Sequence, residues 1–449
     1  AEAPTPTLTL AAQCAPPFRD NAILQRDLPL PVWGTTLSGA EVMVTIGDQV
    51  KKTTADKTGS WKVLLEPLSA VKLSSVNAPP RGETMTIVTK KNGESATVEL
   101  SDLVAGDVWL CAGQSNMAGK MRTNTSRHHP ADSIAKANYP GLRSLTPEGW
   151  LVCSPETAPE FKKVAFFFGR RVHQESLVPI GLIPAAVGGS RIETWLNQEP
   201  YKVGSNYEKL IAPLVGYGLR GMLWYQGESN TEDGRAYTPK LQSLITGWRK
   251  VWGQGDFPAY FVQLPGCRQS DPATPVEEGG WPETREAQFQ ALATPNTGMA
   301  ITIDIGDSNV HPPNKYDTGE RLARLALHHN YGVENLVPSG PTYKGHEIKN
   351  SSIHIRFNHA ESGLMVAEKE GFLPPRPTPD KNSGWLAVQD QEGKWHRAEG
   401  RIEGAGLVVS SKDVPAPVAA RYAYVSLPSS PLLYSKDGLP VAPFTTNGY

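Results

Sequence analysis

The sequence predicts an α/β protein in which two β-rich regions flank a central parallel sheet. Residues 101–335 alternate short apolar runs with helical patterns, which is typical of a parallel sheet covered on both faces by helices. Residues 1–100 and 336–449 instead contain short apolar runs separated by turn residues. The chain has 449 residues, of which 42 are Gly and 39 are Pro, so it is longer than one ordinary domain and rich in turns. We therefore predict three domains with these boundaries.

Each flanking region is predicted to form a β-domain of its own. In the first region the spacing matches a β-sandwich or jelly-roll-like domain, with strands at 31–34, 42–46, 61–65 and 84–88. This region shows no catalytic motif. In the C-terminal region a Pro-rich breaker interrupts the pattern at 374–377, and strands are expected at 353–357, 385–388, 407–410 and 421–426.

The middle region is predicted to hold the catalytic sheet. Its apolar segments lie at 107–112, 180–187, 208–219, 220–225, 258–264 and 299–305. Helical patterns lie between and after them, at 164–176, 238–252, 283–293 and 315–329. Strands of one parallel sheet end at the same edge, where open α/β sheets bind their ligands. We therefore expect the functional residues in the turns that follow these strands.

Composition argues against two classes of partner. The formal net charge is −1 and no basic block is present, so a nucleic acid partner is not expected. No apolar run approaches the roughly 18 residues that a membrane-spanning helix requires. The first residues, Ala1–Pro6, are typical of a mature exported chain whose signal peptide has been removed. We expect a periplasmic or extracellular protein, and nothing in the sequence indicates its oligomeric state.

The four cysteines are widely spaced and fit no zinc motif, so no metal site is predicted from them. Two interpretations stay open. All four can be buried thiols, or two of them can form one disulfide. Because Cys111 lies in a buried strand, Cys153 and Cys267 are the first pair to test for such a bond.

Three apolar runs in the middle region each end in a Gly-x-Ser turn. These turns are Gly113-Gln114-Ser115, Gly188-Gly189-Ser190 and Gly227-Glu228-Ser229. Glycines allow the backbone to approach a ligand closely and leave N–H groups free to donate hydrogen bonds. If the three turns meet at one sheet edge, they can form an oxyanion pocket around a serine nucleophile.

A histidine that could serve as the base follows the last predicted strand of the region. His311 comes shortly after Asp304 and Asp307, and an imidazole oriented by a carboxylate is what a serine hydrolase needs. Ser308 belongs to a Gly-Asp-Ser string that many lipolytic enzymes use for their nucleophile. It lies only three residues before the histidine, so we predict that Ser115 is the nucleophile instead.

The blocks around these turns closely resemble the sialate O-acetylesterase family of the SGNH hydrolases. Residues 108–117 resemble its nucleophile block, residues 186–195 its second block and residues 223–230 its third block. His311-Pro312-Pro313-Asn314-Lys315 and segments near both ends of the chain also match. The resemblance implies an SGNH-type three-layer sandwich and a metal-independent esterase that removes O-acetyl groups from carbohydrate without a cofactor.

The resemblance also implies catalytic roles for individual residues. Ser115 would be the nucleophile and His311 the base. Many SGNH enzymes place an aspartate three residues before the histidine, where this chain has Ser308. Asp307 is therefore our choice for the third member of a triad, with Asp304 as the second choice. A Ser–His dyad oriented by a backbone carbonyl is also open.

The predicted oxyanion hole combines backbone and side-chain donors. It would use the N–H of Ser115, a glycine N–H from Gly188 or Gly189, and the side-chain amide of Gln226 or Asn230. A further set of residues is expected to bind substrate or support the site: Gln114, Glu228, Arg191, Arg285 and Asp304. Within this set we expect Glu228 to pair with Arg285 and so to hold the loop. Arg191 is placed to hold the carboxylate of a sialate.

Two questions about function stay open in the sequence. The main hypothesis is a carbohydrate O-acetylesterase, and the alternative is a non-catalytic carbohydrate-binding protein. That alternative would use exposed tryptophans of the β-regions, namely Trp33, Trp61, Trp385 or Trp395. Within the enzyme hypothesis, sialate and the acetylated polysaccharides xylan, xyloglucan and pectin are all candidate substrates, because a family name and a fold do not fix the substrate.

Overall fold

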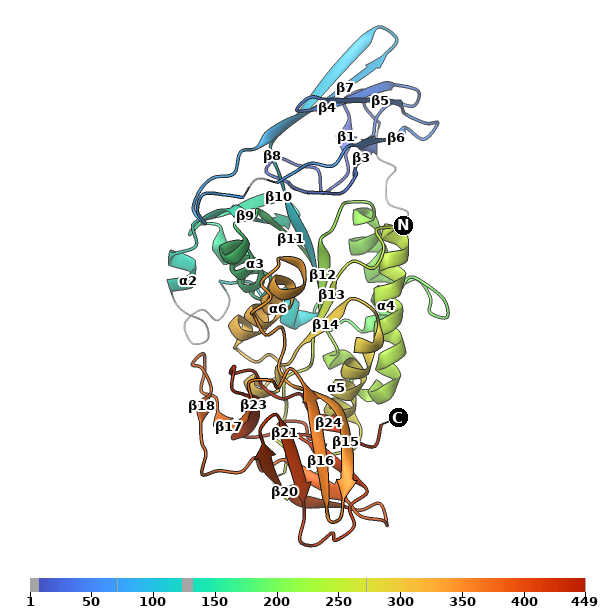
Figure 1. Cartoon of the computed structure of the whole chain (residues 1–449). Coiled ribbons are helices and arrows are strands. Elements are labelled where there is room, and N and C mark those ends of the chain that lie inside the picture. The colour runs from blue at the N-terminus through green and yellow to red at the C-terminus, as the bar shows by residue number, and fades with distance from the viewer. Residues whose placement is uncertain (1–7, 71, 123–131, 272, 449) are drawn as a thin grey trace.

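A mixed sheet runs through the middle of the molecule (Figure 1). The computed structural model describes residues 8–70, 72–122, 132–271 and 273–448. Within these ranges the largest sheet has eleven strands, and its main path follows the order β10-β9-β11-β8-β12-β13-β14. All neighbours on this path are parallel except β10 and β9. The path consists of β8 (Glu94–Gly113), β9 (Tyr139–Thr146), β10 (Gly149–Cys153), β11 (Ile180–Ala186), β12 (Gly221–Tyr225), β13 (Ala259–Val262) and β14 (Thr297–Ala300).

Helices cover both faces of this sheet, as the alternating pattern predicts. On one face, α3 (Lys163–Ser176) and α6 (Lys315–Asn330) pack against a cluster that includes Trp109 of β8. On the other face, α4 (Tyr237–Trp252) and α5 (Gly280–Gln290) contribute to a separate core. The α/β class is therefore confirmed. The four predicted helices are present, with ends displaced by at most three residues.

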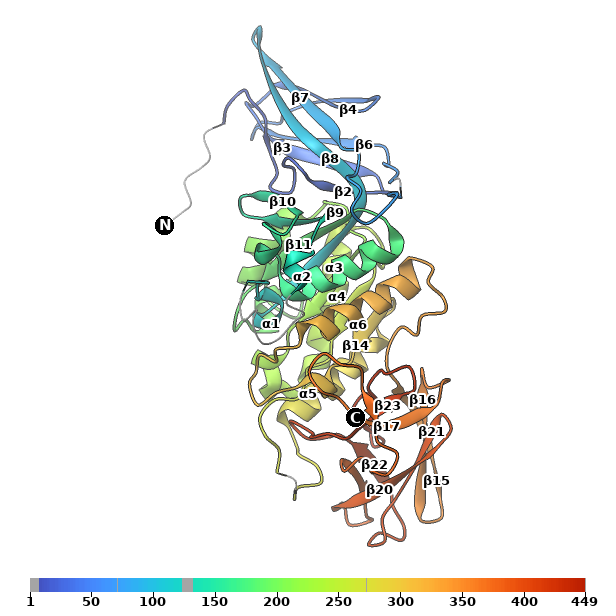
Figure 2. The same cartoon turned by 90° about the vertical axis from the view of Figure 1, so that its left-hand side faces the viewer.

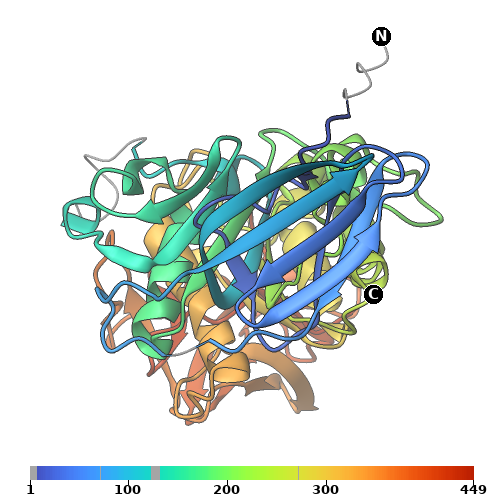
Figure 3. The same ribbon diagram turned by 90° about the horizontal axis from the view of Figure 1, so that it is seen from above.

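The N-terminal strands lie at one end of the central sheet (Figures 2 and 3). They are β1 (Gln13–Cys14), β2 (Ile23–Gln25), β3 (Leu30–Thr35), β4 (Glu41–Ile46), β5 (Gln49–Thr54), β6 (Ser60–Leu65) and β7 (Glu83–Lys91). Strand β8 joins this region to the central sheet, because its first half pairs with β7 and its second half with β11 and β12. The predicted boundary at residue 100 thus falls inside one continuous strand.

The C-terminal strands form two sheets at the opposite end (Figure 1). One follows the order β15-β16-β21-β20-β19-β22-β24 and the other the order β18-β17-β23. Their members are β15 (Thr342–Lys349), β16 (Ser352–Asn358), β17 (Leu364–Glu368), β18 (Arg376–Pro377), β19 (Leu386–Gln389), β20 (Trp395–Glu403), β21 (Gly406–Ser410), β22 (Ala419–Tyr422), β23 (Leu432–Ser435) and β24 (Phe444–Thr445). The division of the chain into three domains stays a prediction.

In the middle region, three segments differ from the sequence prediction. The strand expected at 299–305 ends at Ala300, and the chain then makes a 3-10 turn at Ile303–Ile305. The apolar segment 208–219 forms short helical turns instead of a strand. The hairpin of β9 and β10 was not predicted. The disulfide suggested for Cys153 and Cys267 is wrong, since all four cysteines are free.

Across the described ranges, no helix is long and apolar enough to cross a membrane. The residues behind the export prediction, 1–6, lie outside the described residues, and export stays a prediction. The described residues also contain no group of three or more His, Cys, Asp or Glu side chains that could hold a metal ion.

Candidate active site

Ser115 lies two residues after the end of β8, at the carboxyl edge of the central sheet. The strand ends at Gly113, whose φ of +143° favours glycine, and a Cβ there would lie 2.1 Å from the carbonyl oxygen of Tyr225 on β12. Gln114 donates its N–H to the same oxygen at 3.0 Å. The glycine therefore allows the chain to turn tightly against β12 and begin the short helix α1 (Ser115–Ala118), labelled in Figure 2. The Ser115 side chain remains partly exposed.

His311 reaches Ser115 from the loop that precedes α6. Its Nε2 atom lies 2.8 Å from Ser115 Oγ, a hydrogen bond that joins residues 196 positions apart in the chain. Burial, and to a lesser extent the nearby charge of Lys315, lower the pKa of His311 from its usual range. A lowered pKa keeps the imidazole neutral near pH 7, and only the neutral form can accept the serine proton.

Neither predicted acid contacts this histidine. Asp307 accepts a hydrogen bond from Ser308 at 3.0 Å, and its described contacts include none with His311. The side chain of Asp304 is fully buried and binds Arg321 through both carboxylate oxygens, at 2.6 and 2.7 Å. The structure therefore gives Asp304 a structural role. It brings together Ser115 and His311, but it does not bring Asp307 to them.

The glycine of the second turn lies beside the serine. A Cβ built on Gly188 would lie 3.9 Å from Ser115 Cβ, and Gly189 has a φ of +68° with open space where a side chain would be. The N–H groups of both glycines donate no backbone hydrogen bond in the described part of the chain. Two of the three predicted turns thus meet at the nucleophile, with backbone donors free to act.

The two predicted side-chain amides are already occupied. Gln226 Nε2 donates to Ser190 O at 3.1 Å and to Asn230 Oδ1 at 2.7 Å. Asn230 Nδ2 in turn donates to the carboxylates of Glu193 and Asp233, at 3.0 and 2.6 Å. Both amides hold the second and third turns together, so the prediction that one of them donates to an oxyanion is not supported by their contacts.

Gln114 offers a side-chain amide that is not occupied in this way. Its Oε1 atom accepts the N–H of Ser229 at 3.3 Å, which ties the nucleophile turn to the third turn. The described residues provide no hydrogen-bond acceptor for its Nε2 atom. Gln114 is 3% exposed and directly precedes Ser115. Unlike the amides of Gln226 and Asn230, the Gln114 amide therefore has donor capacity left.

Glu228 and Arg285 do not form the predicted pair. Arg285 is fully buried and donates to the carbonyl oxygens of Pro265, Val425 and Ser426, which holds the C-terminal region against α5. Glu228 accepts a hydrogen bond from Asn116 at 2.5 Å. Its Oε2 atom is buried, and burial raises the pKa of its carboxyl. Glu228 thus contacts the nucleophile turn through Asn116, the residue after Ser115.

Arg191 is also engaged. Its guanidinium lies 2.8 Å from an Asp233 oxygen and 3.5 Å from a Glu193 oxygen, and it donates to Ser229 O at 3.0 Å. A side chain that is already paired with two carboxylates is a poor receptor for a third. These contacts therefore do not support the prediction that Arg191 binds the carboxylate of a sialate.

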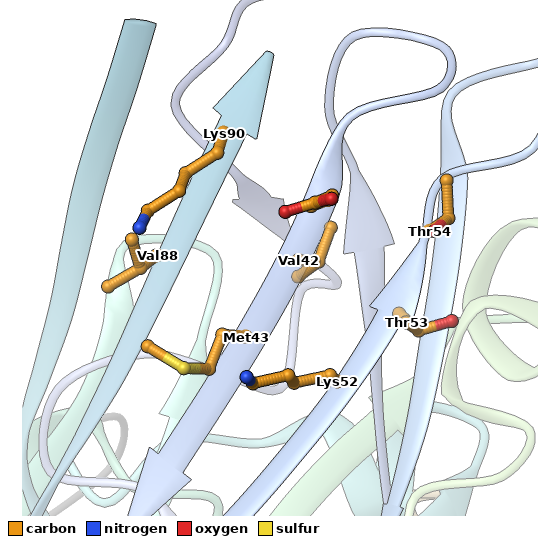
Figure 4. A pocket seen from close by; sticks show the side chains of 8 residues that line it. Val42, Met43, Lys52, Thr53, Thr54, Val88 and Lys90 are labelled. Carbon is orange, nitrogen blue, oxygen red and sulfur yellow. The ribbon is translucent and has the colours of Figure 1, made fainter. Parts of the chain in front are cut away.

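The cavity drawn in Figure 4 lies far from the dyad in the fold. It measures about 440 Å³ and lies on β4, β5 and β7, where Met43 and Val88 are flanked by Lys52 and Lys90. None of the predicted site residues lines it. Of the four tryptophans offered for carbohydrate binding, Trp61 and Trp385 are only 3% and 7% exposed, and Trp33 and Trp395 are half-buried.

Comparisons with known proteins agree with the fold described above. A family model described as carbohydrate esterase, sialic acid-specific acetylesterase, matches residues 105–328. The crystal structure of a carbohydrate acetylesterase from Xanthomonas citri is 30% identical, covers 98% of this chain and 100% of its own, and has a TM-score of 0.83. The chain belongs to the sialate O-acetylesterase family. Members of this family from Homo sapiens and Mus musculus are each 26% identical and cover 95% and 92% of this chain, or 92% and 90% of their own length.

Two polar residues of this family member were not given a role from the sequence. Asn116 and Lys315 lie inside recognised blocks, but only the structure shows that both are buried, 2% and 7% exposed, and that both contact the loop of His311. A signal was available in the sequence. Both residues belong to blocks that form the predicted site, and a charged or amide residue must find a partner when it is buried there.

Proposed function

We propose that the protein is a carbohydrate O-acetylesterase that works through an acyl-enzyme on Ser115. The observation that carries this proposal is the 2.8 Å hydrogen bond between Ser115 Oγ and His311 Nε2 at the carboxyl edge of the sheet. A nucleophile and a base within hydrogen-bond distance are the minimal equipment for acyl transfer. The family membership of the chain supports the choice of an acetyl ester on carbohydrate.

The proposed reaction has two steps that share one base. His311 accepts the hydroxyl proton of Ser115 while Oγ attacks the acetyl carbonyl, and it then donates that proton to the departing sugar oxygen. The acetyl group is now bonded to Ser115. A water molecule, deprotonated by His311, attacks the acyl-enzyme, and acetate leaves while Oγ regains its proton. No cofactor takes part in this scheme.

The proposed oxyanion hole uses donors that are free in the structure. These are the backbone N–H of Ser115, an N–H from Gly188 or Gly189, and the Nε2 amide of Gln114, which replaces Gln226 and Asn230 in this role. Each donor that is well placed for the developing negative charge contributes on the order of 100-fold to 1000-fold in rate.

The decisive variant is Ser115→Ala, measured with p-nitrophenyl acetate and with acetylated polysaccharide. We expect hydrolysis to fall by at least about 1000-fold, because removal of the nucleophile leaves only the oxyanion donors. Ser308→Ala is the matched control, since Ser308 belongs to the alternative Gly-Asp-Ser string, and it should keep wild-type turnover. Near wild-type activity in Ser115→Ala, with an unchanged circular dichroism spectrum, would refute the proposal.

The sugar that carries the acetyl group is the finer part of the proposal. Sialate, xylan, xyloglucan and pectin esters all present the same acetyl carbonyl to Ser115. The contacts of Arg191 with Asp233 and Glu193 give no preference for an acidic sugar. Acetate release measured on acetylated sialate and on each acetylated polysaccharide assigns the substrate directly.

A further inference from the structure

Two peptide carbonyls flank His311, and each accepts a hydrogen bond from a buried side chain. Asn116 Nδ2 donates to Val310 O at 3.0 Å. Lys315 Nζ donates to Pro312 O on the other side. The N–H of His311 itself is bound by Asn309 Oδ1 at 2.9 Å. The backbone on both sides of the histidine is therefore held by side chains, and one of these side chains directly follows Ser115 in the sequence.

Asn116 and Lys315 both interact with the carboxylate of Glu228. Asn116 Nδ2 also donates to Glu228 Oε1, and the positive charge of Lys315 acts on the same carboxylate. Lys315 Nζ lies 6.0 Å from the centre of the Tyr225 ring, on the strand that leads to Glu228. Asn116, Glu228 and Lys315 thus link the nucleophile turn, the third turn and the histidine loop in one buried cluster.

This cluster contacts the backbone on both sides of His311, whereas the acid of a catalytic triad contacts the imidazole ring itself. No carboxylate of a described residue contacts His311, so its ring is not fixed from Nδ1 by an acid. A histidine in an exposed loop has rotational and backbone freedom that must be restricted if Nε2 is to stay near Ser115. Hydrogen bonds to the carbonyl oxygens of Val310 and Pro312 restrict the backbone on both sides of His311.

We propose that Asn116, Glu228 and Lys315 form a positioning network that holds His311 against Ser115 through the Val310 and Pro312 carbonyls. The inference rests on the proposed function, since it concerns the base of that reaction. The three residues do not touch the reacting atoms, and they act through the loop. Lys315 has a second effect, because its charge opposes protonation of the nearby imidazole.

The test is Lys315→Met, which keeps most of the side-chain volume but removes the donor and the charge. We expect kcat on p-nitrophenyl acetate to fall on the order of 100-fold, since a small displacement of a catalytic group has an effect of this size. KM should change by less than about threefold, because Lys315 does not contact substrate. The acid limb of the kcat/KM profile should move to higher pH, because removal of the cation makes His311 easier to protonate.

Lys91→Met is the matched control. Lys91 is half-buried at the end of β7, among the N-terminal strands, and it also donates to a peptide carbonyl, that of Ser38 at 2.5 Å. Loss of this lysine should leave kcat and the acid limb unchanged. Wild-type kcat and an unmoved acid limb in folded Lys315→Met would overturn the network.

The outcome can be separated from a failure of the proposed function. If Ser115→Ala is inactive while Lys315→Met behaves as wild type, the result supports the esterase mechanism and refutes the positioning network. If Lys315→Met does not fold, Asn116→Ala takes its place, because it removes the donor to Val310 and leaves the buried cation. The network then requires a loss of kcat at nearly constant KM, and a wild-type kcat overturns it.

Discussion

The protonation state of His311 decides at which pH the dyad can work. Two causes act in the same direction, since burial disfavours the charged imidazole and Lys315 repels it. The pKa of Lys315 is itself lowered to about 7 by burial, so this lysine is mostly charged in the acid range where His311 titrates. Both effects favour the neutral base.

We therefore expect the acid limb of the kcat/KM profile to have its midpoint below about pH 6.5, the ordinary value for histidine. The free enzyme loses activity when His311 becomes protonated. Because the pKa of His311 is lowered, this protonation occurs at a lower pH. Rates measured from pH 4.5 to 8 on a neutral acetyl ester provide the midpoint. In Asp307→Asn the midpoint should not change, because Asp307 does not contact the histidine. A midpoint above 7 in the wild-type enzyme would contradict the described environment.

Among single residues, the sequence pairs Ser115 with His311, which the structure places in contact, but it does not reveal the contacts of their neighbours. Ser115 and His311 follow from chain order and strand ends, which are visible in the sequence. In the sequence, Gln226 and Asn230 are equally good candidates for the side-chain donor of the oxyanion hole. Only the structure shows that both amides already donate to neighbouring side chains. Asp304 looked like an acid for the histidine, but its contact with Arg321 depends on how α6 packs on the sheet. Partner choice of this kind is set by tertiary packing.

At the scale of one element, the turn after β8 is the feature on which the site depends. Gly113 has a φ of +143°, and a Cβ atom added to it would lie only 2.1 Å from the carbonyl oxygen of Tyr225. A methyl group at this point must push β8 and β12 apart or rotate the turn. Either movement displaces Ser115, two residues further along.

Gly113→Ala should therefore reduce both stability and activity. We expect the free energy of unfolding to fall by about 3 kcal/mol, from overpacking together with the strained backbone. Urea unfolding gives this value, and kcat on p-nitrophenyl acetate reports the displacement of Ser115. Gly119→Ala is the control, since Gly119 has a φ of −61° and no atom within 4 Å of the added methyl group. If Gly113→Ala were as stable and active as this control, the close approach of the two strands would be wrong.

Elements with strong periodicity were predicted well, and the others were not. Helices α3, α4 and α6 carry apolar faces that continue over three or more turns, and their predicted ends lie within one residue of those observed. Helix α5 has a weaker pattern and buries polar side chains, and it begins and ends three residues earlier than predicted. The strand predicted at 299–305 is shorter because Arg321 binds both Ile301 O and the Asp304 carboxylate, which bends the chain after Ala300. The hairpin of β9 and β10 has mixed burial along both strands and so gave no clear alternation in the sequence.

At the scale of the whole molecule, the three predicted regions are joined more closely than their compositions suggest. Strand β8 belongs to the N-terminal strands and to the central sheet at once. Arg285 on α5 binds carbonyls at 425 and 426 in the C-terminal region. Composition changes reveal where the pattern of strands and helices changes. They do not reveal a strand or a buried arginine that crosses such a boundary.

The central claim is that His311 activates Ser115 as a nucleophile, and covalent labelling with a fluorophosphonate tests it most directly. Such a reagent reacts with a serine that has an operating base and leaves a stable adduct. We predict one label per chain, located on Ser115 by peptide mass spectrometry, with activity lost in proportion to labelling. His311→Ala should not be labelled at a comparable rate. Complete inactivation with Ser115 unmodified, or a label found on Ser308, would contradict the account.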